Sequence, residues 1–247
     1  MIKILILGSS GLLGRKIYET LLFNKKIKVV HTGLKKRKIN FKNKAFLKKF
    51  INSVKPNIII NCIANTDTYS KDRQKHWDVN YKGVAELTDF CNYWRVRLIH
   101  ISSDYVYANS SGNYNEQALI DPAENGDCLY GLSKFNSEIL FRYLLKKHEI
   151  NVTNLRVPIV YGEKMDKTRI HKTFESELKE NNTISIWGNG ERVISHICVD
   201  ELVAKVDKII TNKIYGTYNL MGESISLIKL AERIINKKKG GDSKVVL

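Results

Sequence analysis

A tyrosine and a lysine stand four residues apart in the stretch "LYGLSKFNSEIL". Tyr130 and Lys134 occupy positions i and i+4 of a predicted helix, so both side chains project from one helix face. An isolated tyrosine has a pKa of about 10, too high for efficient acid–base catalysis near neutral pH. A neighbouring ammonium group favours the phenolate and lowers this pKa. The spacing predicts a general acid–base pair, but two ordinary residues on a helix surface would have the same spacing.

Three glycines near the N-terminus form a second motif. The segment "GSSGLLG" places Gly8, Gly11 and Gly14 directly after an apolar strand and before a helix. In such a turn the first glycine permits the tight bend, the second lets the backbone approach phosphates, and the third lets helix and strand pack. The phosphates lie at the positive end of the helix. We therefore predict a dinucleotide-binding turn that includes Leu12 and Leu13.

Alternating strands and helices must position these motifs. The continuous apolar run at 3–8 is typical of a strand buried on both faces, and helical apolar spacing follows at 12–24. Further strands are predicted at 27–33, 55–64, 96–103 and 151–162, and further helices at 42–54, 78–94 and 130–148. This order predicts an α/β fold with a Rossmann-type doubly wound parallel sheet.

The pattern changes after residue 162. Helices are predicted at 166–181, 200–211 and 226–236, with short strands between them. We expect residues 1–162 to form a dinucleotide-binding domain to which residues 197–220 return. Residues 163–196 and 221–247 are expected to form a small substrate-binding lobe.

Composition narrows the function classes. The net charge of +16 is spread over many lysine-rich segments, and no zinc-finger or aromatic RNA-binding motif accompanies it, so we expect no nucleic-acid partner. No apolar run approaches the roughly 20 residues of a membrane helix, and no signal peptide is seen, so we expect a cytoplasmic protein without a membrane partner. The four cysteines lack CxxC spacing, so we expect no metal.

The end of the second predicted strand bears on the choice of cofactor. The sequence "VVHTG" has no acidic residue to bind a ribose 2′-hydroxyl. Lys35, Lys36 and Arg37 follow, and cations there favour a 2′-phosphate. We predict NADPH rather than NADH; a solvated basic loop is the alternative interpretation.

Three segments together resemble a known family. The GxxGxxG turn, "SSDYVY" at 102–107 and "LRVPIVYG" at 155–162 are similar to the extended short-chain dehydrogenase/reductases, in particular the dTDP-4-dehydrorhamnose reductase family. All landmarks are in order over residues 2–220. The resemblance implies a catalytic triad of Ser103, Tyr130 and Lys134. In that triad Tyr130 protonates a carbonyl oxygen while hydride reaches the carbon, and Ser103 hydrogen-bonds the same oxygen.

The resemblance also implies further cofactor contacts. They follow the second and third predicted strands, and they are Arg37, Asn40, Phe41, Ile63, Ala64 and Asn65. Asn80 matches a helix asparagine that the family uses structurally and in proton relay.

On the substrate side, the resemblance implies contacts from Ser103, Asp104, Ile159 and Arg192, the last to a diphosphate. Tyr105 stands where sugar-nucleotide dehydratases have a glutamate, which disfavours dehydration. The function implied is an NAD(P)H-dependent reductase of a nucleotide-linked 4-keto sugar, in the synthesis of cell-surface polysaccharide precursors. A sugar-nucleotide epimerase and a non-catalytic NADP-binding regulatory subunit remain alternatives, and a homodimer remains open.

Overall fold

The structure is a computed structural model that describes residues 1–32, 44–68, 72–107, 112–120, 128–147, 150–237 and 243–247. The chain divides into two compact units. The first contains Met1–Val157 and Val203–Leu220, and the second contains Pro158–Leu202 and Met221–Leu247.

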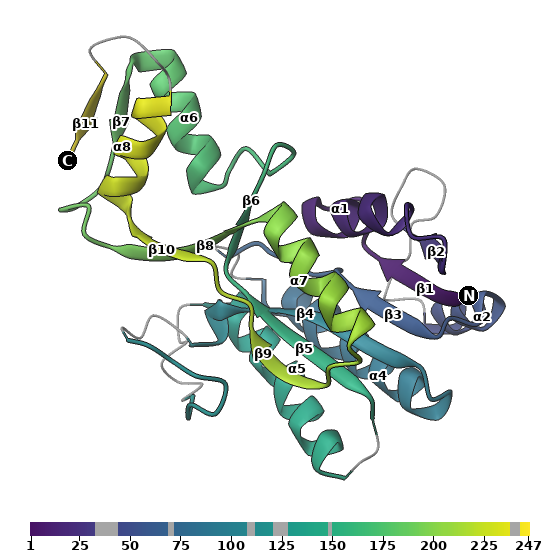
Figure 1. Cartoon of the computed structure of the whole chain (residues 1–247). Coiled ribbons are helices and arrows are strands. Elements are labelled where there is room, and N and C mark those ends of the chain that lie inside the picture. The colour runs from purple at the N-terminus through teal and green to yellow at the C-terminus, as the bar shows by residue number, and fades with distance from the viewer. Residues whose placement is uncertain (33–43, 69–71, 108–111, 121–127, 148–149, 238–242) are drawn as a thin grey trace. The chain divides into compact units, whose positions relative to one another are not determined.

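The first unit is built on a six-stranded sheet (Figure 1). Its order is β2-β1-β3-β4-β5-β9, and every neighbouring pair is parallel. The chain reverses its direction across the sheet at β1, which is the defining feature of a doubly wound fold and confirms the predicted fold class. The strands are β1 (Ile2–Leu7), β2 (Ile27–His31), β3 (Ile58–Asn61), β4 (Arg97–Ser103), β5 (Val152–Val157) and β9 (Gly216–Asn219).

Helices cover both faces of this sheet. On one face, Leu5, Ile59 and Leu98 are fully buried against α2, α4 and α5. On the other, the guanidinium of Arg97 donates to the carbonyl oxygen of Ile209 in α7 at 2.9 Å. The helices are α1 (Leu12–Leu21), α2 (Lys44–Val54), α3 (Arg73–His76), α4 (Gly83–Tyr93), α5 (Leu129–Lys146) and α7 (Val199–Thr211). No helix in the described ranges is long and apolar enough to cross a membrane.

The second unit combines two small sheets with two helices. In the three-stranded sheet β10-β8-β6, β8 pairs antiparallel with β10 and parallel with β6, while β11 and β7 form a separate parallel pair. Apolar side chains of α6 and α8 and of the strands β7, β8 and β10 form its core. The elements are β6 (Ile159–Tyr161), α6 (Ile170–Asn181), β7 (Thr183–Ser185), β8 (Val193–Cys198), β10 (Glu223–Ser226), α8 (Leu227–Lys237) and β11 (Lys244–Val246).

The strand predicted at 151–162 is two strands in two different sheets. β5 ends at Val157 and β6 begins at Ile159. Pro158 lies between them and has no N–H to donate to a ladder, which explains why the strand does not continue.

Candidate active site

The turn between β1 and α1 gives each glycine a different role. Gly8 has a φ of +86°, and a Cβ there would lie 3.0 Å from Ile63. A Cβ on Gly14 would lie 2.4 Å from the Gly8 carbonyl oxygen, so a side chain at this position would push α1 off the turn. A Cβ on Gly11 would meet only that oxygen, at 3.6 Å. The space beside Gly11 is therefore open to a ligand.

The N-terminus of α1 is suited to an anion. Gly11 caps it without a side-chain hydrogen bond, and the first turn holds no acidic residue, so the positive end of the helix is not neutralised locally. Leu12 and Leu13 are half-buried in this turn. The turn is held by Ser9, whose Oγ donates to the Thr32 carbonyl oxygen at 2.7 Å. These features fit the pyrophosphate of a dinucleotide.

Three of the predicted cofactor contacts, Arg37, Asn40 and Phe41, lie outside the described residues. The other three, Ile63, Ala64 and Asn65, are half-buried just after β3. The Nδ2 atom of Asn65 is buried without a hydrogen-bond partner among the described residues. Leaving such a donor unpaired costs about 1–3 kcal/mol, so an acceptor on a bound ligand would stabilise it. This observation independently fits a polar cofactor group at this position.

A π-helical turn, Trp77–Lys82, places Asn80 beside this segment. Asn80 is fully buried; its Oδ1 accepts from the Asn65 N–H at 2.8 Å and its Nδ2 donates to the Asn65 carbonyl oxygen at 2.9 Å. The same Nδ2 donates to Ser133 Oγ at 2.9 Å, and Ser133 Oγ donates to the Tyr130 carbonyl oxygen at 2.8 Å. Asn80 thus joins the end of β3 to the first turns of α5. π-Helical turns occur often at functional sites.

Ser103 and Tyr130 lie next to the carboxyl end of β4. Ser103 is buried at the last position of the strand, and its Oγ donates to Asp104 Oδ1 and accepts the Tyr105 N–H, both at 3.2 Å. Tyr105 belongs to a 3-10 turn, Asp104–Tyr107, that follows β4. Its ring meets the Tyr130 ring edge-on, with centroids 5.7 Å apart.

Lys134 is fully buried one turn further along α5. Its Nζ donates to the Ile101 carbonyl oxygen in β4 at 2.7 Å. The structure therefore brings Ser103, Tyr130 and Lys134 together at the end of β4, on elements in direct contact.

Two pKa values in this region are displaced towards neutral pH. Burial lowers the pKa of Lys134 to about 8, against the opposing effect of the Glu138 carboxylate and a smaller one of Cys62. Burial also raises the pKa of the Asp104 carboxyl to about 7, against its hydrogen bonds from Ser103 and the Tyr105 N–H. Displaced pKa values of this kind concentrate at functional sites.

The sequence of the chain is similar to a known family over most of its length. A family description, NAD dependent epimerase/dehydratase family, matches residues 4–220. The chain belongs to this family. The resemblance seen in the sequence is confirmed, and the protein is a member of a family of NAD(P)-dependent sugar-nucleotide enzymes.

Several known proteins are similar to the chain. The dTDP-4-dehydrorhamnose reductase of Aggregatibacter actinomycetemcomitans is 30% identical over 90% of this chain and 74% of its own length. The solved structure of a dTDP-4-dehydrorhamnose reductase from Clostridium acetobutylicum matches with a TM-score of 0.84 at 26% identity, over 99% of this chain and 83% of that one. Methionine adenosyltransferase 2 subunit beta of Xenopus laevis is 28% identical over 79% of this chain, which spans only 58% of that relative.

Two predicted substrate contacts of this epimerase/dehydratase family member lie in the second unit. Ile159 is half-buried at the start of β6, in register with His196 of β8. Arg192 is exposed just before β8, and its carbonyl oxygen accepts the Leu227 N–H at 3.0 Å. The exposed guanidinium is available to an anionic ligand.

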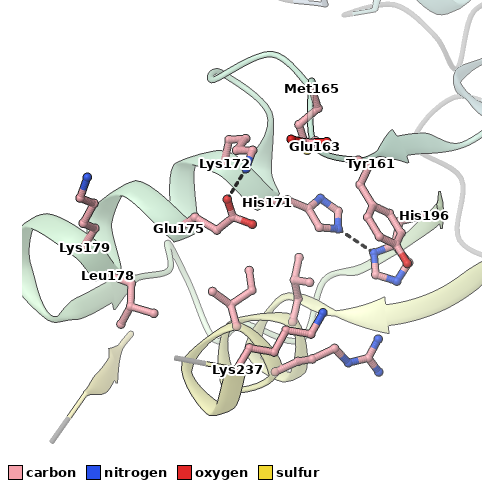
Figure 2. Close-up of a pocket in the computed structure, with 14 residues that line it drawn as sticks. Tyr161, Glu163, Met165, His171, Lys172, Glu175, Leu178, Lys179, His196 and Lys237 are labelled. Atoms are coloured by element: carbon pink, nitrogen blue, oxygen red, sulfur yellow. Dashed lines mark hydrogen bonds and ion pairs between the residues drawn. The ribbon is translucent and has the colours of Figure 1, made fainter. Parts of the chain in front are cut away.

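The second unit also contains a cavity of about 480 Å³ lined by α6 and α8 (Figure 2). His171 and His196 point toward each other at its edge, with Nε2 and Nδ1 2.8 Å apart, and the Tyr161 ring stacks on His171. Burial and the neighbouring His196 lower the pKa of His171 to about 4, so His171 is neutral near pH 7. His171 could not be predicted from the sequence, because one histidine on a helix belongs to no motif.

Proposed function

We propose that this protein is an NAD(P)H-dependent reductase of a nucleotide-linked 4-keto sugar, similar to dTDP-4-dehydrorhamnose reductase, in the synthesis of cell-surface polysaccharide precursors. The observation that supports it most is the buried Lys134, one turn from Tyr130, whose Nζ donates to the Ile101 carbonyl oxygen in β4, the strand that ends at Ser103. The likeness to two dTDP-4-dehydrorhamnose reductases supports the same substrate class.

The cofactor in this proposal is NADPH, with NADH as the less favoured form. The glycine turn would hold its pyrophosphate, and the segment after β3 would lie against its nicotinamide ribose. Arg37 would bind the 2′-phosphate, and Asn40 with Phe41 the adenine. The residues assigned to the turn and to the ribose are Gly8, Gly11, Leu12, Leu13, Gly14, Ile63, Ala64, Asn65, Tyr130 and Lys134.

The reduced nicotinamide supplies the hydride, and the side chains supply the rest of the chemistry. The Tyr130 hydroxyl donates its proton to the carbonyl oxygen of the sugar. Ser103 Oγ donates a hydrogen bond to the same oxygen as negative charge develops on it. Lys134 holds positive charge near Tyr130, which favours the phenolate, and it contacts the ribose.

The substrate contacts proposed beyond Ser103 and Asp104 come from the second unit. Arg192 would pair with the diphosphate, because a guanidinium offers two parallel donors to phosphate oxygens. Ile159 would contact the sugar. We propose this unit as the substrate-binding lobe and the first unit as the dinucleotide-binding domain.

Two other functions use parts of the same site. A sugar-nucleotide epimerase would keep NAD bound and recycle it, so purified protein would carry stoichiometric NAD. A regulatory subunit that binds NADP without catalysis is favoured by the likeness to methionine adenosyltransferase 2 subunit beta. In that case a partner enzyme would copurify and no keto sugar would be turned over.

The test is oxidation of NADPH in the presence of dTDP-, UDP-, GDP- and CDP-linked 4-keto sugars. We expect turnover with at least one of them. Tyr130→Phe should retain cofactor binding and lose about 10²–10⁴-fold in kcat, because the proton donor is removed.

Tyr143→Phe is the matched control for this substitution. Tyr143 lies on the same helix with an exposed side chain, so its variant should keep wild-type activity. Cofactor binding without turnover of any of the four sugar classes would refute the reductase proposal. Full activity in Tyr130→Phe would refute the role given to Tyr130.

A further inference from the structure

A buried chain of polar side chains leads from β3 to Lys134. Asn61 and His100 are in register on the neighbouring strands β3 and β4, and both are fully buried. Asn61 Nδ2 lies 3.2 Å from His100 Nδ1, and His100 Nε2 lies 3.5 Å from Lys134 Nζ. The other side of the imidazole meets the Phe141 ring edge-on at 5.3 Å. Both nitrogens of His100 therefore face a polar partner.

The direction of these hydrogen bonds follows from one backbone group. The Ile63 N–H can only donate, and it donates to Asn61 Oδ1 at 3.1 Å, which fixes the orientation of the amide. The Nδ2 group of Asn61 can also only donate, so His100 Nδ1 must accept. A neutral imidazole whose Nδ1 accepts carries its proton on Nε2. His100 therefore directs an N–H, not a lone pair, at Lys134.

We propose that His100 is a positioning residue that donates a hydrogen bond from Nε2–H to the amine of Lys134 and so makes the proton of Lys134 easier to release. The proposal rests on the proposed function, in which Tyr130 gives a proton to the substrate. A proton then passes from the Lys134 ammonium to the Tyr130 phenolate. The neutral amine that remains accepts the Nε2–H hydrogen bond, and water returns the proton to the amine.

The groups around Lys134 agree with this assignment. From β4, the Ile101 carbonyl oxygen accepts one Nζ proton at 2.7 Å, and burial with the Lys134 charge holds the pKa of His100 well below its usual value, so the ring is neutral. After β3, burial raises the pKa of Cys62 to about 12, so its thiol is also neutral.

From α5 itself, Tyr130 and Glu138 flank Lys134. The Glu138 carboxylate already pairs with the buried Arg156, with Nη2 and Oε2 2.6 Å apart. Of the groups named around Lys134, only Glu138 carries a negative charge, and that charge is largely compensated. Little negative charge therefore stabilises the Lys134 ammonium. An N–H of His100 directed at Nζ should favour the neutral amine over the ammonium.

The first test reads the tautomer of His100 in protein without cofactor or substrate. Histidine labelled with ¹⁵N is observed by long-range ¹H–¹⁵N NMR, and the His100 signals are assigned as those missing in His100→Phe. We expect a neutral ring with protonated Nε2 and unprotonated Nδ1 throughout the neutral range. A ring protonated at Nδ1, alone or as imidazolium, would overturn the proposal. This result does not depend on finding a substrate, so it separates failure of the inference from failure of the proposed function.

The second test is the pH dependence of kcat/KM in His100→Phe, which keeps the ring contact and removes the N–H. We assign the alkaline limb of this profile to loss of the Lys134 proton. In His100→Phe the limb should shift to higher pH by roughly one unit, because the ammonium form of Lys134 no longer faces an N–H donor. Phe141→Leu, which alters packing on the other side of the ring and leaves the hydrogen bond, should not move this limb. An unchanged limb in His100→Phe, or an equal shift in both variants, would contradict the proposed role.

Discussion

Buried titratable side chains gather where β4 ends. Lys134 has its pKa lowered and Asp104 has its pKa raised, both chiefly by burial, while Glu138 is neutralised by an ion pair with Arg156. Burying such groups costs stability, and proteins concentrate them where they serve chemistry. The burial of Lys134, Asp104 and Glu138 at the end of β4 is therefore a main reason to expect an active site there.

The raised pKa of Asp104 has a testable effect on stability. The carboxyl titrates at about 7 in the folded protein and near 3.9 in the unfolded chain, so the folded state binds the proton more tightly. The free energy of unfolding therefore falls as pH rises from about 4 to about 7. The displacement of the pKa from 3.9 to about 7 corresponds to roughly 4 kcal/mol. Asp104→Asn removes this loss, so it should raise the Tm by roughly 10 °C near pH 8.

Thermal unfolding at two pH values checks this expectation. Near pH 3 the Asp104 carboxyl is largely protonated in both the folded protein and the unfolded chain, so the variant and the wild type should unfold at about the same temperature. The same Tm difference at both pH values would contradict a raised pKa.

Single site residues could be predicted from the sequence where they belong to a motif with a fixed spacing. The i, i+4 relation of Tyr130 and Lys134 and the glycine intervals are visible without a structure. Asn61 and His100 are different, because their contact depends on the register of β3 against β4. No pattern within either strand encodes that register. The pairing of His171 with His196 is likewise a tertiary contact between a helix and a strand.

At the scale of elements, the turn between β1 and α1 offers a matched pair of variants. Gly14→Ala would put a Cβ 2.4 Å from the Gly8 carbonyl oxygen, so it should displace α1 and cost about 1–3 kcal/mol of stability as well as cofactor binding. Gly11→Ala has room in the folded protein, so it should leave the Tm nearly unchanged. Its methyl group would occupy the space proposed for the pyrophosphate, so it should weaken NADPH binding about tenfold or more.

Calorimetric titration with NADPH and thermal unfolding of both variants provide the two readings. If Gly11→Ala bound NADPH as tightly as the wild type, the phosphate site would not lie on this turn.

Most elements follow from the apolar pattern, and the exceptions have physical causes. The helix predicted at 78–94 begins with a π-helical turn, Trp77–Lys82, before α4. A single π-helical turn has no apolar spacing of its own from which it could be predicted. Pro158 divides a predicted strand, but whether the chain leaves one sheet for another there depends on tertiary pairing. Buried polar residues such as Arg156 were also not predicted, since their partners are distant in sequence.

At the scale of the whole molecule, the net charge and the family membership both indicate anionic ligands. A net charge of +16 raises the local concentration of anionic ligands, and both a dinucleotide cofactor and a nucleotide sugar are anions. The match over residues 4–220 covers the first unit and most of the second. Neither charge nor family distinguishes a reductase from an epimerase, because the triad proposed for this chain would serve both reactions. The fate of the hydride distinguishes them.

The most direct measurement is transfer of deuterium from NADPH labelled at nicotinamide C4 to a nucleotide-linked 4-keto sugar. A reductase places the label on C4 of the sugar and oxidises one NADPH for each product molecule, and we predict this result. Tyr130→Phe should slow the transfer without changing its position. No transfer of label to any keto sugar, together with interconversion of a 4-hydroxyl nucleotide sugar and its C4 epimer without net oxidation of NADPH, would contradict the account and identify an epimerase.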